Sequence, residues 1–196
     1  MPSRTRRKQR RQTFKRSPSL LVALLVGSLL GYEVALYHNP GQATYVSDSA
    51  AIQVRFSPGG HCTQFIEDVI AKAQKTIFVQ AYAFTSAPIT DALIAAHHRG
   101  VLVRMLVDRS QRDGKYTQVP RVLQAGIPVA IDKVPGIAHN KIMIIDDQYV
   151  LTGSFNWTKA AETRNAENLL LINDPATNRI YKAMWQQRAA RAQAIE

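Results

Sequence analysis

The residues best suited to chemistry lie in the stretch HNKIMIIDDQYVLTGSFN, residues 139–156. Its polar skeleton is H-x-K-x4-D-x6-G-S-x-N. The stretch supplies an imidazole, a fixed cation and hydrogen-bond donors, without the carboxylate or cysteine cluster that usually holds a metal. Such a set suits a phosphate. Lys141 and Asn156 would bind the non-bridging oxygens, while the imidazole of His139 attacks phosphorus or moves a proton.

The same stretch predicts the β-hairpin that positions these side chains. Two short apolar runs, IMII and YVLT, flank the sequence DDQ, which is typical of a hairpin. If a two-residue turn connects the strands, Asn156 lies across from His139. Ser154 then lies across from Lys141, and all four side chains share one face. A three-residue turn would change this pairing, so the register is a hypothesis.

The spacing of these residues resembles the signature of the phospholipase D superfamily. The likeness extends to the bacterial phospholipase-D-like endonucleases, because GSFNWTKAAETRNAEN at 153–168 resembles their version of the motif and its tail. AYAFTSAPI at 81–89 and GIPVAID at 126–132 also occur where that family has similar segments. The resemblance covers residues 52–195, and its motif is long and spaced.

The resemblance implies a fold in which two copies of the motif face each other. This chain has one copy, so the resemblance implies a homodimer with the active site at the interface. One His139 would attack phosphorus to give a phosphohistidine, and the other would protonate the leaving oxygen. Lys141 and Asn156 would take the place of a metal, so we expect no metal and no cofactor.

The remaining motif residues have supporting roles in this interpretation. The resemblance implies that Glu167 is catalytic through a hydrogen bond to the imidazole. Ser154 is expected to join the substrate-binding residues. Asp146 and Gly153 are assigned to structure, because Asp146 follows the first strand of the hairpin and alternation points it away from His139.

Around the hairpin, alternating strand and helix patterns predict an α/β fold with a mixed sheet flanked by helices on both faces. Strand, helix, strand, helix, strand in the first half predicts a parallel portion of sheet. The last helix, which begins near Pro175, is expected to pack through Ile180, Met184 and Trp185. Strands are expected at 52–56, 77–84, 101–107, 127–131 and 166–172, and helices at 65–73, 89–96 and 119–123.

The third of these strands leads into DRSQRDGKY, a loop that contains Arg109, Arg112 and Lys115. Ligands in α/β sheets bind near loops at the carboxyl ends of strands. If this loop borders the site, its cations would contact phosphates along a polynucleotide. The alternative is an ordinary solvated loop.

Most of the charge of +11 belongs to the N-terminus of the 196 residues. Residues 1–16 contain eight Lys and Arg and no acid, whereas residues 17–196 have a net charge of +3. A strongly basic pI therefore does not make the whole surface a nucleic-acid binder.

The basic residues precede an apolar segment at 20–37 that is either a signal peptide or a short membrane anchor. Either one would engage the membrane or the export machinery and place the rest of the chain across the cytoplasmic membrane, periplasmic or secreted. A basic arm that binds nucleic acid would leave the apolar run unexplained. We expect residues 1–43 to be this leader, 44–51 a linker and 52–196 the nuclease domain.

Cys62 is the only cysteine, which excludes an internal disulfide and a cysteine-based metal site. Its neighbour His61 is a weak metal candidate, because no further ligands follow at a suitable spacing.

Three functions fit the sequence. The first is an exported, metal-independent endonuclease that hydrolyses DNA, with RNA as a further substrate. The second is a phospholipase acting on membrane phosphodiesters, which the apolar leader favours. The third is a non-catalytic nucleic-acid-binding relative, which the complete motif argues against. The match through residues 153–168 favours the first.

Overall fold

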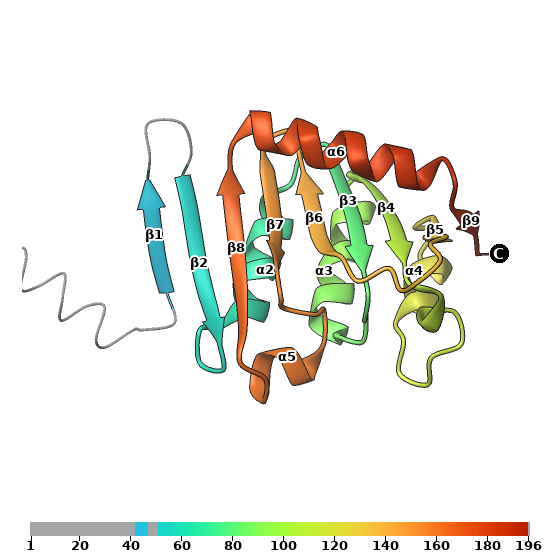
Figure 1. The fold of residues 1–196 in the computed structure, drawn as a ribbon, viewed down its shortest axis with the longest axis horizontal. Coiled ribbons are helices and arrows are strands. Elements are labelled where there is room, and N and C mark those ends of the chain that lie inside the picture. The colour runs from blue at the N-terminus through green and yellow to red at the C-terminus, as the bar shows by residue number, and fades with distance from the viewer. Residues whose placement is uncertain (1–41, 47–50, 196) are drawn as a thin grey trace, which may run out of the picture. The chain divides into compact units, whose positions relative to one another are not determined.

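The computed structural model describes residues 42–46 and 51–195, which form an α/β fold (Figure 1). In this part of the chain, nine strands make one sheet in the order β1-β2-β8-β7-β6-β3-β4-β5-β9. The strands are β1 (Gln42–Val46), β2 (Ala51–Ser57), β3 (Thr76–Ala81), β4 (Leu102–Val107), β5 (Val129–Ile131), β6 (Lys141–Ile145), β7 (Tyr149–Gly153), β8 (Glu167–Asn173) and β9 (Gln193–Ala194). The helices are α2 (Cys62–Lys72), α3 (Ala87–His98), α4 (Val119–Gln124), α5 (Lys159–Thr163) and α6 (Pro175–Ala189), with the 3-10 turn η1 (Arg109–Gln111). The predicted fold class is confirmed.

The sheet is parallel where helices connect its strands and antiparallel elsewhere. β3, β4 and β5 run parallel, with α3 and α4 in the crossovers, whereas β6, β7, β8 and β2 follow as antiparallel neighbours. The predicted parallel portion is therefore present, but β2 is not next to β3. Three later strands lie between them, because β2 pairs with β8 over its whole length.

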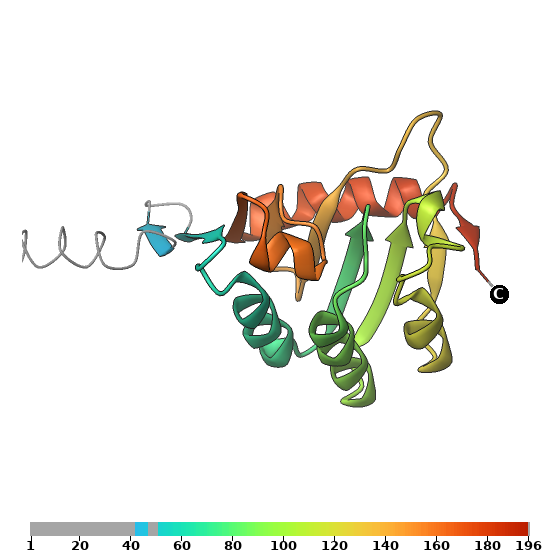
Figure 2. The same cartoon turned by 90° about the horizontal axis from the view of Figure 1, so that it is seen from below.

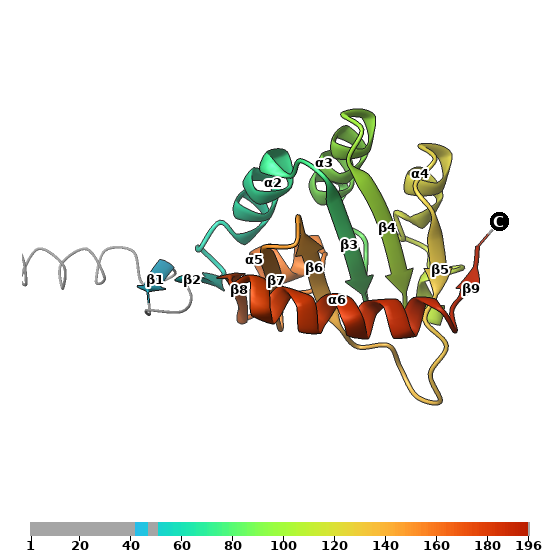
Figure 3. The same ribbon diagram turned by 90° about the horizontal axis from the view of Figure 1, so that it is seen from above.

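Helices cover the two faces of the sheet unequally (Figures 2 and 3). α2, α3 and α4 lie on one face, and α6 crosses the other. On β6, Ile142 and Ile144 pack with Trp185 of α6, whereas Met143 and Ile145 belong to the larger core under α2 and α3. Because both faces are covered, β6 is buried along its whole length and shows no polar alternation.

α6 packs on the sheet through Trp185, as predicted, but not through Ile180 and Met184. Trp185 is buried, stacks on Phe78 at 4.7 Å between ring centroids and donates its Nε1–H to the carbonyl oxygen of Val79 at 3.0 Å. Ile180 and Met184 are exposed by 71% and 51%. Their predicted packing role is wrong, because they lie on the outer side of the helix.

The N-terminal boundary also differs from the prediction. The expected linker at 44–51 overlaps β1, which pairs antiparallel with β2. Residues 47–50 lie outside the described part, and so do residues 1–41 of the leader expected at 1–43, whose last two residues belong to β1. None of the helices within residues 42–46 and 51–195 has the length and hydrophobicity needed to cross a bilayer.

The hairpin of β6 and β7 has a three-residue turn. Ile145 pairs with Tyr149, and Ile142 pairs with Thr152. Asp146 and Asp147 have φ angles of 52° and 57°, in the left-handed region that short aspartate side chains tolerate. The predicted two-residue turn is therefore wrong, and so is the pairing of His139 with Asn156 and of Lys141 with Ser154.

Candidate active site

The motif residues gather where several strands begin or end. The carboxyl end of β3 lies beside the start of β6, since Ala81 pairs with Lys141. The end of β7 lies beside the start of β8, since Gly153 pairs with Leu169. Figure 1 shows this end of the sheet next to α5. His139, just before β6, therefore lies at the same end as the residues that follow β7.

Tyr82 contacts both His139 and Lys141. The ring centroids of Tyr82 and His139 are 4.4 Å apart, and the Lys141 ammonium lies 5.0 Å from the Tyr82 ring centroid. Lys141 is 5% exposed and donates from Nζ to the carbonyl oxygen of His139 at 2.7 Å. His139 is exposed. A buried cation thus lies directly behind an accessible imidazole.

Burial and the charge of Glu167 act in opposite directions on the pKa of Lys141. Burial lowers the pKa of Lys141, and the nearby negative charge of Glu167 raises it in part. Desolvation strengthens the attraction between this ammonium and an incoming phosphate oxygen, because water screens the pair less. Glu167 and Lys141 thus interact electrostatically across the site.

Ser154 holds Glu167. Its hydroxyl donates to Glu167 Oε2 at 2.6 Å and accepts from the Asn168 N–H at 3.0 Å. Asn165 Nδ2 donates to Glu167 Oε1 at 2.9 Å. Both carboxylate oxygens are therefore occupied, and His139 is not among the partners of Glu167 in this single chain. The expected hydrogen bond between Glu167 and the imidazole is absent from the described residues.

Gly153 permits a close approach between backbones. A Cβ atom there would lie 2.3 Å from the carbonyl oxygen of Asn168, and φ is 152°. That same oxygen accepts hydrogen bonds from the N–H groups of Ser154 and Phe155 at 3.1 and 3.2 Å. A side chain at this position would push the two strand ends apart where Ser154 meets Glu167.

Trp157 anchors the segment that carries Asn156. Trp157 is fully buried and donates from Nε1 to the carbonyl oxygen of Gln80 at 3.1 Å. Its own carbonyl accepts from the N–H groups of Thr85 and Ser86. Thr85 and Ser86 of the segment AYAFTSAPI therefore help to hold the segment GSFNW in place.

One side-chain atom of Asn156 has no hydrogen-bond partner among the described residues. Its Oδ1 is buried and accepts no hydrogen bond from them. Leaving a buried acceptor unpaired costs about 1–3 kcal/mol. An unpaired buried acceptor of this kind calls for an explanation, such as a bound water.

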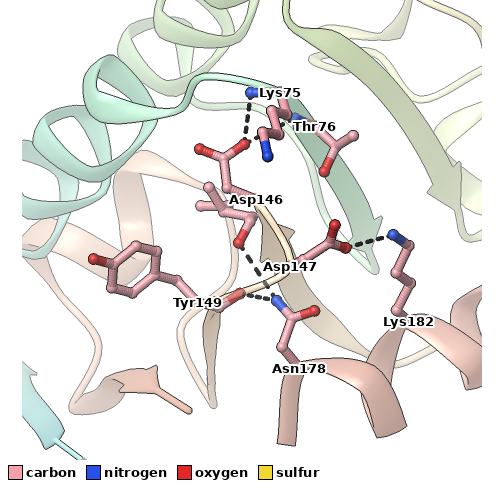
Figure 4. Close-up of polar contacts among 8 residues, drawn as sticks. Lys75, Thr76, Asp146, Asp147, Tyr149, Asn178 and Lys182 are labelled. Atoms are coloured by element: carbon pink, nitrogen blue, oxygen red, sulfur yellow. Dashed lines mark hydrogen bonds and ion pairs between the residues drawn. The ribbon is translucent and has the colours of Figure 1, made fainter. Parts of the chain in front are cut away.

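Asp146 lies at the far end of the hairpin (Figure 4). Its carboxylate accepts hydrogen bonds from the backbone N–H groups of Gln74, Lys75 and Thr76 at 2.6, 2.7 and 2.9 Å. The neighbouring Asp147 pairs with Lys182 of α6. Asp146 therefore ties the hairpin turn to the start of β3 and is remote from His139.

Asp108 was not singled out from the sequence, although it supports the loop before His139. It is 2% exposed and accepts from the N–H groups of Ser110 and Ala138 at 2.9 and 2.7 Å. Burial alone would raise the pKa of Asp108, but the hydrogen bonds from Ser110 and Ala138 together with the positive charge of Arg109 outweigh it, and the pKa is lowered. Asp108 is therefore held as a carboxylate.

Glu162 of α5 caps the start of α2. Glu162 accepts from the Thr63 N–H in the first turn of α2 at 2.7 Å. Cys62 is buried, which raises the pKa of its thiol to about 11. In residues 42–46 and 51–195, no three His, Cys, Asp or Glu side chains gather as ligands for a metal ion.

Comparison with known proteins identifies the family. Residues 66–188 match the family described as cardiolipin synthase, PLD-like domain. A phospholipase D of Rickettsia conorii is 40% identical over 197 residues, which cover 90% of this chain and 98% of that protein. A mitochondrial cardiolipin hydrolase of Chlamydomonas reinhardtii is 36% identical over 108 residues, 55% of this chain and 48% of that protein.

Among solved structures, the fold is similar to Nuc from Salmonella typhimurium, a phospholipase D family member. The TM-score is 0.71 at 35% identity, and the match covers 75% of this chain and 99% of Nuc. The family match, the relatives and the fold agree with the motif geometry. The chain therefore belongs to the phospholipase D superfamily, as a hydrolase of the phosphodiesterase type.

Proposed function

We propose that this protein is an exported, metal-independent endonuclease that hydrolyses DNA, and RNA as a second substrate. The observation that carries the proposal is the open position of the reactive end. His139 and Ser154 are exposed at the end of the sheet, and Lys141 lies just behind them. An endonuclease must admit a phosphodiester in the middle of a long polymer, so its site has to be open on both sides of the bond.

The chemistry follows from the groups at this end. The imidazole of His139 attacks phosphorus and forms a nitrogen–phosphorus bond, while the bond to the leaving oxygen breaks. A second His139 protonates that oxygen. Water then attacks the phosphohistidine, which releases the phosphate monoester and restores the imidazole. Lys141 and Asn156 contact the non-bridging oxygens, where negative charge grows in the transition state.

The second imidazole comes from a second copy of the chain in this proposal. The motif occurs once, and an isologous dimer is the simplest way to bring two copies together. His139 is exposed, so a second chain could reach its imidazole. The N-terminal leader would engage the membrane or the export machinery and would thereby carry the site out of the cytoplasm.

A lipid phosphodiester is the second candidate substrate. Ile137, two residues before His139, is 55% exposed, and Tyr116 is 69% exposed. Apolar side chains beside the site could enter a bilayer surface. Relatives named phospholipase D and mitochondrial cardiolipin hydrolase point in the same direction.

One experiment separates these candidates. The purified full chain is incubated with supercoiled plasmid DNA and, separately, with phospholipid vesicles that contain cardiolipin, both in excess EDTA. We expect nicking of the plasmid and no lipid hydrolysis. Hydrolysis of lipid alone would establish the second candidate, and activity that needs added Mg²⁺ or Zn²⁺ would refute the metal-independent mechanism. The His139→Ala variant, purified identically, controls for contaminating nucleases.

A further inference from the structure

Beside the loop that leads to His139 lies a hollow of about 490 Å³. Its lining includes Arg109 and Arg112, which follow β4, and Lys133 and Gly136 from the loop between β5 and β6. That loop projects beyond α6 in the two opposite views of Figures 2 and 3. Two segments that are distant in sequence therefore build one surface next to the reactive end.

The cations of this hollow are available to a ligand. Arg109, Arg112 and Lys133 are exposed. None of these three side chains forms a hydrogen bond or an ion pair with a residue in 42–46 or 51–195. Asp113 is an exposed acid in the loop after β4 and offsets part of this charge.

The two acids that line the hollow offset only part of the positive charge. The charge of Arg109 lowers the pKa of Asp108, but both acids form their hydrogen bonds with other groups. Asp108 is buried and accepts from backbone N–H groups. Asp132 is 4% exposed and accepts from Arg188 at 3.2 Å and from Gln80 at 3.3 Å. The hollow thus presents positive charge to solvent.

The position of the hollow suits a phosphate close to the cleaved bond. Gly136 lines it and lies three residues before His139, so their Cα atoms are within about 11 Å. With one phosphate per roughly 3.4 Å of axis along each strand of a duplex, this is a few nucleotides. We propose that Arg109, Arg112 and Lys133 bind the phosphates of a polynucleotide a few nucleotides from the bond that His139 attacks. This inference rests on the proposed nuclease function.

Salt dependence tests the inference without requiring hydrolysis. The full chain with His139→Ala binds a fluorescein-labelled single-stranded 20-mer, and anisotropy gives the affinity across a range of NaCl concentrations. Adding R109Q, R112Q and K133Q should reduce the slope of log affinity against log salt by about 2, since each contact to a single strand contributes roughly 0.7. The basic residues at 1–16 are the same in both proteins, so their contribution cancels in the difference between the two slopes.

A matched control removes the same charge from the other end of the sheet. K72Q, K75Q and R179Q together change exposed cations near the Asp146 turn and on α6, and the slope should remain unchanged. An unchanged slope for R109Q, R112Q and K133Q, or an equal fall for the control, would overturn the inference.

Activity separates this inference from the proposed function. With His139 intact, the triple variant R109Q, R112Q and K133Q should cleave bis(p-nitrophenyl) phosphate within about twofold of the wild-type kcat/KM, because this small diester does not reach the hollow. Its kcat/KM on DNA should fall. A wild-type chain that cleaves no phosphodiester would refute the nuclease proposal, whereas equal DNA cleavage by wild type and triple variant would refute the phosphate subsite alone.

Discussion

The carboxylate of Asp108 accepts a hydrogen bond of 2.7 Å from the backbone N–H of Ala138, although the two residues are 30 positions apart. Asp108 immediately follows β4, and Ala138 immediately precedes His139. The bond therefore fixes the end of the loop that carries the imidazole against the rigid parallel part of the sheet. Asp108 is a positioning residue in this arrangement, since it acts through the backbone.

Replacing Asp108 by Asn should lower kcat without a comparable rise in KM. The amide has one acceptor oxygen in place of two, so one of the N–H groups of Ser110 and Ala138 loses its partner. A displacement of about 1 Å can cost roughly a hundredfold in rate. Steady-state kinetics and circular dichroism measure the effect, and Asp91→Asn, which changes an exposed acid on α3, is the control. A wild-type kcat in Asp108→Asn would contradict this role.

The pH profile should report on Lys141. Burial lowers the pKa of Lys141, and Glu167 counteracts this. Since Lys141 must be protonated to bind phosphate, kcat/KM should fall on the alkaline side below the ordinary lysine value of 10.5. In Glu167→Gln the opposing negative charge is lost, so the pKa of Lys141 falls further and the alkaline limb moves to lower pH.

The measurement is kcat/KM for bis(p-nitrophenyl) phosphate between neutral pH and the point where the fold is lost. Glu167→Gln should retain measurable activity, whereas His139→Ala should retain none. An alkaline limb at the same pH in wild type and Glu167→Gln would show that Glu167 does not act on Lys141.

Gly153→Ala should destabilise the fold and disturb the site together. The new methyl group would lie 2.3 Å from the Asn168 carbonyl oxygen, so the ends of β7 and β8 must separate. We expect a loss of about 1–3 kcal/mol in the free energy of unfolding. Gly136→Ala is the control, because nothing lies within 4 Å of the added carbon. Denaturant unfolding measures both variants, and equal stability would contradict the close approach.

The sequence predicted the elements well and their pairing less well. Apolar runs such as that of β6 identify a strand buried on both faces, but they do not say which strand lies beside it. The position of β2 next to β8 depends on a partner more than 100 residues later in the chain. The predicted hairpin register is wrong because Asp146 adopts a positive φ and belongs to the turn. Three hydrogen bonds from backbone N–H groups at and just before the start of β3 stabilise this position of Asp146.

The part of the site that belongs to the spaced motif could be predicted from the sequence. His139, Lys141 and Asn156 follow from residue types and intervals. Tyr82 and Asp108 do not, because their contacts with the site arise only when β3 pairs with β6 and β4 pairs with β3. A position directly after a buried strand was the available signal for both residues.

Mixing wild-type and His139→Ala chains tests whether one active site needs two copies. If both imidazoles are required, a mixed dimer has no complete site, and only wild-type pairs turn over. When equal amounts of the two chains are co-refolded and pair at random, about one quarter of the dimers are wild-type pairs. Activity should then fall with the square of the wild-type fraction. Independent sites would give a linear fall, to about one half.

The shape of the titration is informative only when the subunits have exchanged. A mass tag on the His139→Ala chain, read by native mass spectrometry, shows the share of mixed dimers in each sample. With random mixing verified, a curve that follows the square of the wild-type fraction means that each site uses His139 from both subunits. A straight line under the same conditions means that each chain catalyses alone, which would refute the shared site.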